Sequence, residues 1–389
     1  MTLLQQPVIA AVIILAIIAA GEVISVLTRA KVPMLLIAIL IYMGLLWTGI
    51  LPKDIIKNST FTSIGMVMIA PLIVHMGTLI PFKVMKQQYK SVLISLISVL
   101  IGGGLVLLII PPILGYTTAV IGIGPMIGGN IATIITTTEL ERLGLNALVT
   151  IPVLMLAIHK LFGMPLTSYF LQRYAIHFRD HLQQQDTAND SDLSAIKGSD
   201  ASAPSGRFNS PYIMVFKLFL GGALATMLDE WTGINYTLFC LIFGIVGAQI
   251  GFYQQNMMDH AKATGIAMIG TVFIVISSMT DVTFGMFISY IPKVLLILLF
   301  GLVGVLVGGY FSSKLLKWDP RKGMSVALTS MYGFPADYIL CQEVSRSVGR
   351  TPEEQKRILD DLAPPMLIGG FTTVTVASVV IASLLIKTL

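Results

Sequence analysis

Apolar segments of about 20 residues recur along this sequence from one end to the other, and a helix of that length crosses the ~30 Å hydrocarbon core of a bilayer. Only 12% of the 389 residues are charged, whereas soluble domains carry about 25%. The mean hydropathy is +0.85. These features predict an all-α polytopic membrane protein. They exclude a soluble enzyme, a disulfide-stapled secreted domain and a nucleic-acid-binding protein.

Hydropathy, punctuated by Gly, Pro and charged residues, divides the chain into ten predicted spans and two interrupted segments. The spans cover 7–28, 33–51, 61–81, 91–114, 147–171, 211–229, 234–252, 261–281, 289–316 and 362–387. The interrupted segments, about 117–145 and about 322–347, begin apolar, are broken by Gly or Pro, and end polar. Residues 176–210 are rich in Ser, Asp, Gln and Gly, which is typical of a disordered linker.

The two halves on either side of this linker, 1–175 and 211–389, show the same order of spans and interruptions. A shift of 202 residues superposes Gly49 on Gly251, and a shift of about 205 superposes the two interrupted segments. We therefore expect two membrane repeats, each with five transmembrane helices and one interrupted segment.

The placement of basic residues predicts the topology. If each interrupted segment is a re-entrant hairpin, each half has five crossings and the second repeat is inverted relative to the first. Eighteen of the 25 basic residues then lie on the side of the linker 176–210, as the positive-inside rule requires. If the interrupted segments crossed fully, this asymmetry would mostly vanish. The sequence thus predicts both termini outside and the linker in the cytoplasm.

Matched interruptions in inverted repeats are the best sequence indication of a transporter's binding site. The first tip lies near Gly124–Asn130, where glycines allow a ligand to approach the backbone, and the second lies at Tyr332–Asp337. A helix that restarts after each tip presents free N–H groups and a positive dipole end to an anion. The alternative is that these residues only kink ordinary membrane helices, where Gly and Pro are frequent.

Polar residues near the tips and in the last span of each half are the candidate solute ligands. They are Asn130, Thr133 and Thr137 after the first tip, Asp337, Tyr338 and Gln342 after the second, and His159, Lys160 and Thr373 in the last spans. Asp337 could bind a cation or exchange a proton, or it could simply cap a helix. Lys160 could neutralise a carboxylate, or snorkel or pair with an acidic neighbour.

The stretch YGFPADYILCQEVSRSVG from Tyr332, followed by PPMLIGGFTTVTVASVVIAS from Pro364, resembles the bacterial sodium/glutamate symporter family. It is more distantly similar to the sodium-coupled citrate and other 2-hydroxycarboxylate transporters. The resemblance implies two opposed hairpins that meet at mid-membrane and bind solute with Na⁺. It also implies a homodimer, in a bacterial cytoplasmic membrane, in which a transport domain slides against a dimerising scaffold.

Because the resemblance implies that the tips bind Na⁺, Gly128, Gly129, Asp337 and Thr372 are the candidate Na⁺ ligands. The sequence departs from the family pattern at Gly333-Phe334-Pro335, which keeps little of a Gly-Gly-x-Gly tip.

We therefore expect a secondary transporter with an elevator-type mechanism, not an enzyme. Its expected activity is sodium-coupled symport of a small anionic solute such as glutamate or a related amino or carboxylic acid. A proton-coupled or exporting transporter of another small polar solute is the alternative within this class. A channel or a membrane sensor is the alternative from a different class, since paired re-entrant loops also line pores.

Overall fold

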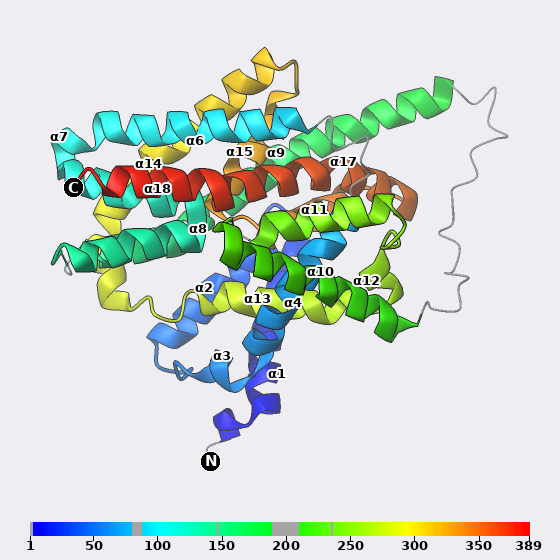
Figure 1. Ribbon diagram of the computed structural model, residues 1–389, viewed down its shortest axis with the longest axis horizontal. Coiled ribbons are helices and arrows are strands. Elements are labelled where there is room, and N and C mark those ends of the chain that lie inside the picture. The colour runs from blue at the N-terminus through cyan, green and yellow to red at the C-terminus, as the bar shows by residue number, and fades with distance from the viewer. Residues whose placement is uncertain (1–2, 80–87, 146–147, 189–209, 235) are drawn as a thin grey trace.

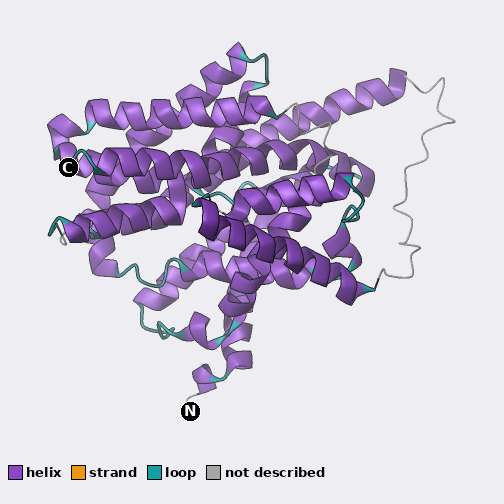
Figure 2. Ribbon diagram, in the orientation of Figure 1, coloured by secondary structure: helices purple, strands orange, loops and turns teal. Residues whose placement is uncertain are grey.

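The computed structural model describes residues 3–79, 88–145, 148–188, 210–234 and 236–389. These residues form helices joined by loops, with no strand among them (Figure 2). Seven helical segments in this part of the chain are long and apolar enough to cross a membrane. The predicted class, an all-helical polytopic membrane protein, is confirmed at this level.

Each of the ten predicted spans contains at least one helix. In the first half the helices are α1 (Pro7–Leu27), α2 (Met34–Trp47), α3 (Ile55–Asn58), α4 (Phe61–Thr78), α6 (Tyr89–Ile109), α7 (Pro111–Leu114), α8 (Tyr116–Arg142) and α9 (Thr150–Ala188). In the second half they are α10 (Pro211–Thr232), α11 (Tyr236–Gln249), α12 (Met257–His260), α13 (Thr264–Ser277), α14 (Phe284–Leu315), α15 (Pro320–Leu328), η3 (Thr329–Met331), α16 (Ala336–Val348), α17 (Pro352–Phe371), the π-helical turn η4 (Thr372–Ala377) and α18 (Ser378–Ile386). Three of the helices in the predicted spans, α2, α11 and α13, have only 14 residues and are shorter than the seven long apolar segments.

Helix α9 differs from the prediction, because it continues to Ala188 where a disordered linker was expected from residue 176. The extension contains Arg, Gln and Leu, which favour helix even where the chain is too polar to span a membrane. Arg179 also fastens it to the second half by donating to the carbonyl oxygen of Val348 at 3.1 Å. Most of the rest of the predicted linker, 189–209, lies outside the described residues.

The helices form two bundles (Figure 1). The support bundle contains α1–α4 and α10–α13, and the hairpin bundle contains α6–α9 and α14–α18. Within the described chain, the helix pairs that pack extensively belong to the same bundle, and a minor contact of α2 with α9 connects the two bundles. Each half of the sequence therefore gives its first three spans to one bundle and its remaining helices to the other.

Local backbone features also recur at the shift of 202 residues. The short helix α3 is followed 202 residues later by the equally short α12. Gly49 and Gly251 have φ values of 75° and 78°, and Thr60 and Lys262 have φ values of 61° and 54°. The two halves thus repeat the same backbone turns as well as the same order of spans.

Glycine pairs bring the matching helices of the two halves into direct backbone contact. A Cβ atom on Gly65 of α4 would overlap the carbonyl oxygen of Gly270 in α13. A Cβ atom on Gly304 of α14 would lie 2.7 Å from the Cα of Gly102 in α6. Small residues at such crossings allow close helix packing in membranes, where van der Waals contact drives association.

Gly304→Ala should lower the thermal stability of the detergent-solubilised protein, because the added methyl meets backbone that cannot move away. We expect a loss of about 1–3 kcal/mol, measured as a lower unfolding midpoint. Gly104→Ala is the matched control, since nothing lies within 4 Å of its added Cβ. An unchanged midpoint for Gly304→Ala would contradict the close contact between α6 and α14.

Candidate functional site

The first interrupted segment folds back on itself within α8. Gly129 has φ 64° and ψ −146°, a conformation that residues with side chains rarely adopt. A Cβ atom on Gly124 would lie 3.1 Å from the hydroxyl of Thr136. In a continuous helix these two residues would be about 18 Å apart along the axis. The two parts of α8 therefore lie side by side, joined at Gly129.

The α8 fold-back lies along the end of the chain. The hydroxyl of Tyr116, at its start, is 2.8 Å from that of Thr388. Near its tip, a Cβ atom on Gly128 would overlap the side chain of Ser378. The segment thus runs along α18 from the C-terminal end of the last span toward its middle.

The second interrupted segment follows α9 in the same manner. Lys322, at its start, lies 3.3 Å from the hydroxyl of Tyr174. The hydroxyl of Tyr332, at the break, donates to Thr167 Oγ1 at 2.9 Å. The segment then returns, since Val348 accepts from Arg179 further along α9. Along α9, both ends of this segment therefore lie on the C-terminal side of its break, which lies near the middle of the helix.

The two breaks meet at Val374 in the last span. A Cβ atom on Gly129 would be 3.3 Å from one Val374 methyl, and a Cβ atom on Gly333 would be 3.0 Å from the other. Val374 belongs to the π-helical turn η4, a distortion that occurs frequently at functional sites. The Phe334–Pro335 peptide bond beside it is cis.

A cavity of about 410 Å³, here called the central cavity, opens beside this meeting point. Its hairpin-bundle wall includes Gly129, Lys160, the segment 334–336 and Val374. Its support-bundle wall comes from α4, α11 and α13 with the adjoining Ser278. The central cavity therefore lies on the boundary between the two bundles.

Lys160 is the charged side chain among the described residues that line the central cavity. The residue is 7% exposed, and its ammonium donates to Ser278 Oγ at 3.1 Å. No carboxylate lies within ion-pair distance of it among the described residues. A buried cation without a counterion is costly and attracts an anion.

Asp337 lies behind the cavity wall and is fully buried. Its Oδ1 accepts from the backbone N–H of Tyr338 at 2.7 Å, whereas Oδ2 has no hydrogen-bond partner. A Cβ atom on Gly370, which lines the cavity, would be 2.7 Å from Oδ2. An ionised carboxylate left in this state costs on the order of several kcal/mol, so the position suits a bound cation or a proton.

Four predicted solute or ion ligands on helices, together with His159, are absent from the described lining of the central cavity. Thr133 and Thr137 donate to carbonyl oxygens of their own helix, as Thr372 and Thr373 also do. Buried His159 lies 2.7 Å from the carbonyl oxygen of Met155. The side chain of Asn130 is outside the described part of the structure.

The remaining predicted residues of the second tip lie further along α16. Tyr338 lines a different cavity, and Gln342, one turn beyond it, is half-buried. Of the predicted Na⁺ ligands, Gly128 lies against Ser378 and Gly129 lines the central cavity.

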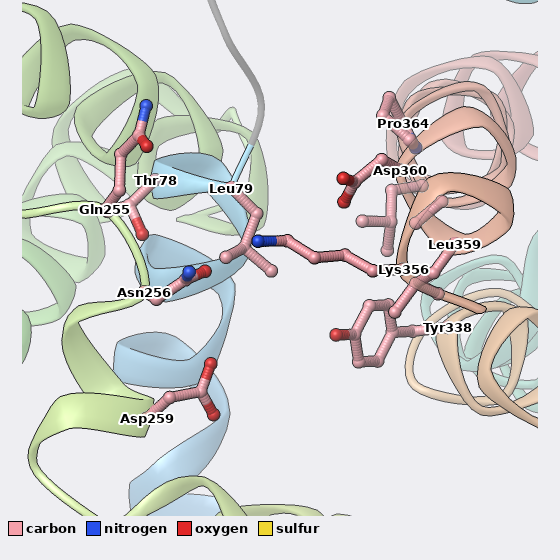
Figure 3. Close-up of a pocket in the computed structure, with 12 residues that line it drawn as sticks. Thr78, Leu79, Gln255, Asn256, Asp259, Tyr338, Lys356, Leu359, Asp360 and Pro364 are labelled. Carbon is pink, nitrogen blue, oxygen red and sulfur yellow. The ribbon is translucent and has the colours of Figure 1, made fainter. Parts of the chain in front are cut away.

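That different cavity, the charged cavity, has a volume of about 390 Å³ and lies on the same boundary between the bundles (Figure 3). Asp259 and Asn256 line its support-bundle side, and Lys356, Asp360 and Tyr338 line the opposite side. The Lys356 side chain extends across the gap between the two walls.

Asp259, in the charged cavity, lies 3.5 Å from Nε2 of the buried His75. Burial opposes ionisation of Asp259, but the neighbouring His75, Thr264 and His260 side chains together outweigh it and hold the pKa of this carboxyl below its usual value. The charged cavity thus keeps a fixed negative charge on its support-bundle wall.

Glu343 is a functional candidate that the sequence did not indicate. Its buried carboxylate accepts from Ser25 Oγ at 2.9 Å and from the backbone N–H of Met34 at 3.2 Å. The second bond caps the N-terminus of α2, where a negative charge is favourable. Glu343 therefore ties the second interrupted segment to the support bundle. The sequence gives no local indication of this role, because Ser25 and Met34 lie more than 300 residues away from Glu343 along the chain.

Comparison with known proteins identifies a similar solved structure but no family for this chain. No family model matches the chain, and no curated protein matches it significantly. Among solved structures, the chain is similar to a sodium/proton antiporter of Methanocaldococcus jannaschii at pH 8. The identity is 14%, the TM-score is 0.46, and the match covers 98% of this chain and 99% of the other. Both similarity values are too low to bear on what this chain does.

Ser278→Cys should react rapidly with a small hydrophilic thiol reagent in detergent, because residue 278 lines the central cavity. Ser98→Cys should stay unreacted, since Ser98 is fully buried where α6 meets α14. The two native thiols, Cys240 and Cys341, are buried and should give a low background. The extent of modification of each thiol would be measured by mass spectrometry. Equal protection of the two introduced thiols would contradict an accessible central cavity.

Proposed function

We propose that this protein is a secondary active transporter of a small anionic organic solute, coupled to Na⁺ by inward symport. The single observation that carries the proposal is the meeting of two folded-back segments beside a cavity on the boundary between two bundles. Interrupted helices at membrane depth are tolerated where protein buries them or where they line a cavity. Such helices form the solute and ion sites of transporters built from repeats.

The inverted arrangement of the two repeats is part of this proposal. The fold-back of α8 starts beside Thr388, at the C-terminal end of the last span. The second fold-back starts beside Tyr174, whose hydroxyl also donates to Asp361 near the start of that span. The two segments thus approach Val374 from opposite ends, which supports opposed re-entrant hairpins. The contacts of α4 with α13 and of α6 with α14 fit a two-fold relation between repeats.

The proposed mechanism is alternating access of an elevator type. The hairpin bundle carries both tips, Lys160 and Asp337, and would move against the support bundle as a body. Close backbone packing of helices is extensive within each bundle and sparse between them, which favours this division, while buried apolar side chains also meet across the boundary. The sequence resemblance extends the proposal to a homodimer formed through the support bundle. It also extends it to a cytoplasmic membrane with both termini outside.

Solute and ion have separate places in this scheme. The ammonium of Lys160, buried without a counterion, would attract the anionic group of the solute. The unpartnered Oδ2 of Asp337 would bind Na⁺ through a hard oxygen. An occupied cation site would offset the negative charge of the carboxylate while the hairpin bundle crosses the membrane. Glutamate or a related amino or carboxylic acid is the solute that the sequence resemblance favours.

Proton coupling is the second candidate, and one observation favours it. A single proton on Asp337 Oδ2 would also relieve a buried carboxylate that lacks a partner. The two candidates differ in which gradient drives accumulation, so one experiment separates them.

Purified protein in proteoliposomes should accumulate small organic acids when an inward Na⁺ gradient is imposed. Replacing Na⁺ by K⁺ should abolish accumulation, and a pH gradient alone should not restore it. Equal flux without Na⁺ would remove the sodium proposal, and accumulation driven by pH alone would favour the proton.

Asp337→Asn should reduce Na⁺-driven accumulation by about tenfold or more, because the amide removes the charge that attracts the cation. Glu139→Gln is the matched control, since this carboxylate pairs with Arg142 at the far end of α8. If Asp337→Asn kept both transport and its Na⁺ dependence, the residue would have no part in coupling.

A further inference from the structure

We infer that the central cavity selects a monocarboxylate with an apolar body, in preference to glutamate or a dicarboxylate. The inference rests on the proposed function and names the class of solute that the same site would take, in place of the glutamate that the sequence resemblance favours. It follows from the charges, hydroxyl groups and aromatic rings that the structure places around the cavity.

The charges in the cavity match one carboxylate. Lys160 is the charged residue among the described lining residues, and neither Asp nor Glu lines the cavity in this part of the chain. The ammonium group of an α-amino acid would therefore move from water into the cavity without finding a carboxylate in the described lining to pair with. Burying an unpaired charge is strongly unfavourable. Asp337 does not replace the missing anion, because it lies behind the wall.

Four of the hydroxyl groups in the described lining already donate within the protein, and the other two, of Tyr236 and Thr237, carry no charge to match a second carboxylate. Thr271, Ser277 and Ser278 each donate to a carbonyl oxygen of α13, at 2.8, 2.8 and 2.7 Å. Tyr332 donates its hydroxyl to Thr167. Their protons are therefore already engaged, and a carboxylate accepts hydrogen bonds but donates none. A dicarboxylate would have one charge matched by Lys160 and the other unmatched.

The remaining wall is apolar and partly aromatic. Phe334 and Phe371 stack with their ring centroids 5.8 Å apart and their planes 28° apart. Val374 and Ile274 extend this surface from the two bundles. Aromatic and aliphatic walls with a few placed polar groups are typical of small-molecule sites. The hydrocarbon body of a monocarboxylate would be buried against this surface.

The charged cavity shows what a different selectivity would require. Its lining has both signs of charge, with Lys356 opposite Asp259, and it adds the amides of Gln255 and Asn256 (Figure 3). A zwitterion would find partners for both of its charges there. The central cavity, between the two tips, has no such pairing among its described residues.

Thermal stabilisation of the purified full-length protein in Na⁺ tests this inference, because ligands that bind the folded state raise its unfolding midpoint. The probes are phenylacetate and 4-methylpentanoate as apolar monocarboxylates, with L-glutamate, L-phenylalanine, succinate and phenethylamine as comparisons. We expect the two monocarboxylates to raise the midpoint in a saturable manner and the four comparisons to leave it nearly unchanged.

Lys160→Met should weaken binding of the monocarboxylates by roughly 10- to 100-fold, the range for losing a charge-assisted hydrogen bond. Lys217→Met is the matched control. This lysine also lies in an apolar helix, but it packs on Phe252 and lines neither cavity. The inference is overturned if Lys160→Met binds like the parent protein, or if Lys217→Met loses as much affinity.

The same six compounds, tested for Na⁺-driven uptake in proteoliposomes, distinguish a failure of the proposed selectivity from a failure of the transporter proposal. Uptake and stabilisation by glutamate or succinate, equal to that by phenylacetate, would overturn the selectivity and leave the transporter proposal intact. Stabilisation and Na⁺-driven uptake confined to the monocarboxylates would support both. Failure of every compound in both assays would overturn the selectivity together with the proposed function.

Discussion

Backbone polar groups at membrane depth must find partners, and this constraint governs the two interrupted segments on which the rest of the structure depends. Both segments leave helical geometry in the middle of a predominantly apolar chain. They are stable because each folds back along the last span of the opposite half and is buried there. Gly129 and Gly333 supply the backbone conformations at the breaks, and the π-helical turn at Val374 fits between them.

The two breaks lie at the boundary between the bundles, close to the buried charged groups Lys160 and Asp337. Strong packing at Gly65–Gly270 and Gly102–Gly304 holds each bundle together. Between the bundles the structure has two cavities, the contact of α2 with α9, polar ties such as Glu343 to Ser25, and buried apolar side chains that belong to cores shared by both bundles. A buried cation and a buried carboxylate lie within a few residues of the boundary, on the bundle that would move. This combination is hard to explain by stability alone, because unpaired buried charges destabilise a fold.

Much of the architecture could be predicted from the sequence, because hydropathy and Gly/Pro punctuation are local signals. The ten helices, the breaks near Gly129 and Gly333, and the shift of 202 residues between halves were all accessible in this way. The extension of α9 to Ala188 was not, since a polar helix fastened by Arg179 resembles a linker in composition.

The site was only partly predictable for a related reason. Charges within apolar segments are conspicuous, so Lys160 and Asp337 were identified from the sequence. Ser278 and the Phe334–Phe371 stack join the site only through tertiary packing, and nothing local distinguishes them from other serines and phenylalanines. Thr133 and Thr137 share a helix face near the tip, yet their hydroxyls bond to their own backbone.

Relative movement of the two bundles is the central claim, and a distance measurement between them tests it most directly. Spin labels at Lys57 in the support bundle and Arg142 in the hairpin bundle would be measured by pulsed electron resonance, with and without Na⁺ and phenylacetate. Both positions are exposed, and a second pair at Lys57 and Glu230 lies wholly within the support bundle. We predict that the distance distribution between Lys57 and Arg142 shifts or divides when ligands are added, while the distribution between Lys57 and Glu230 stays constant. A single distribution between the bundles, unchanged under all conditions, would contradict it.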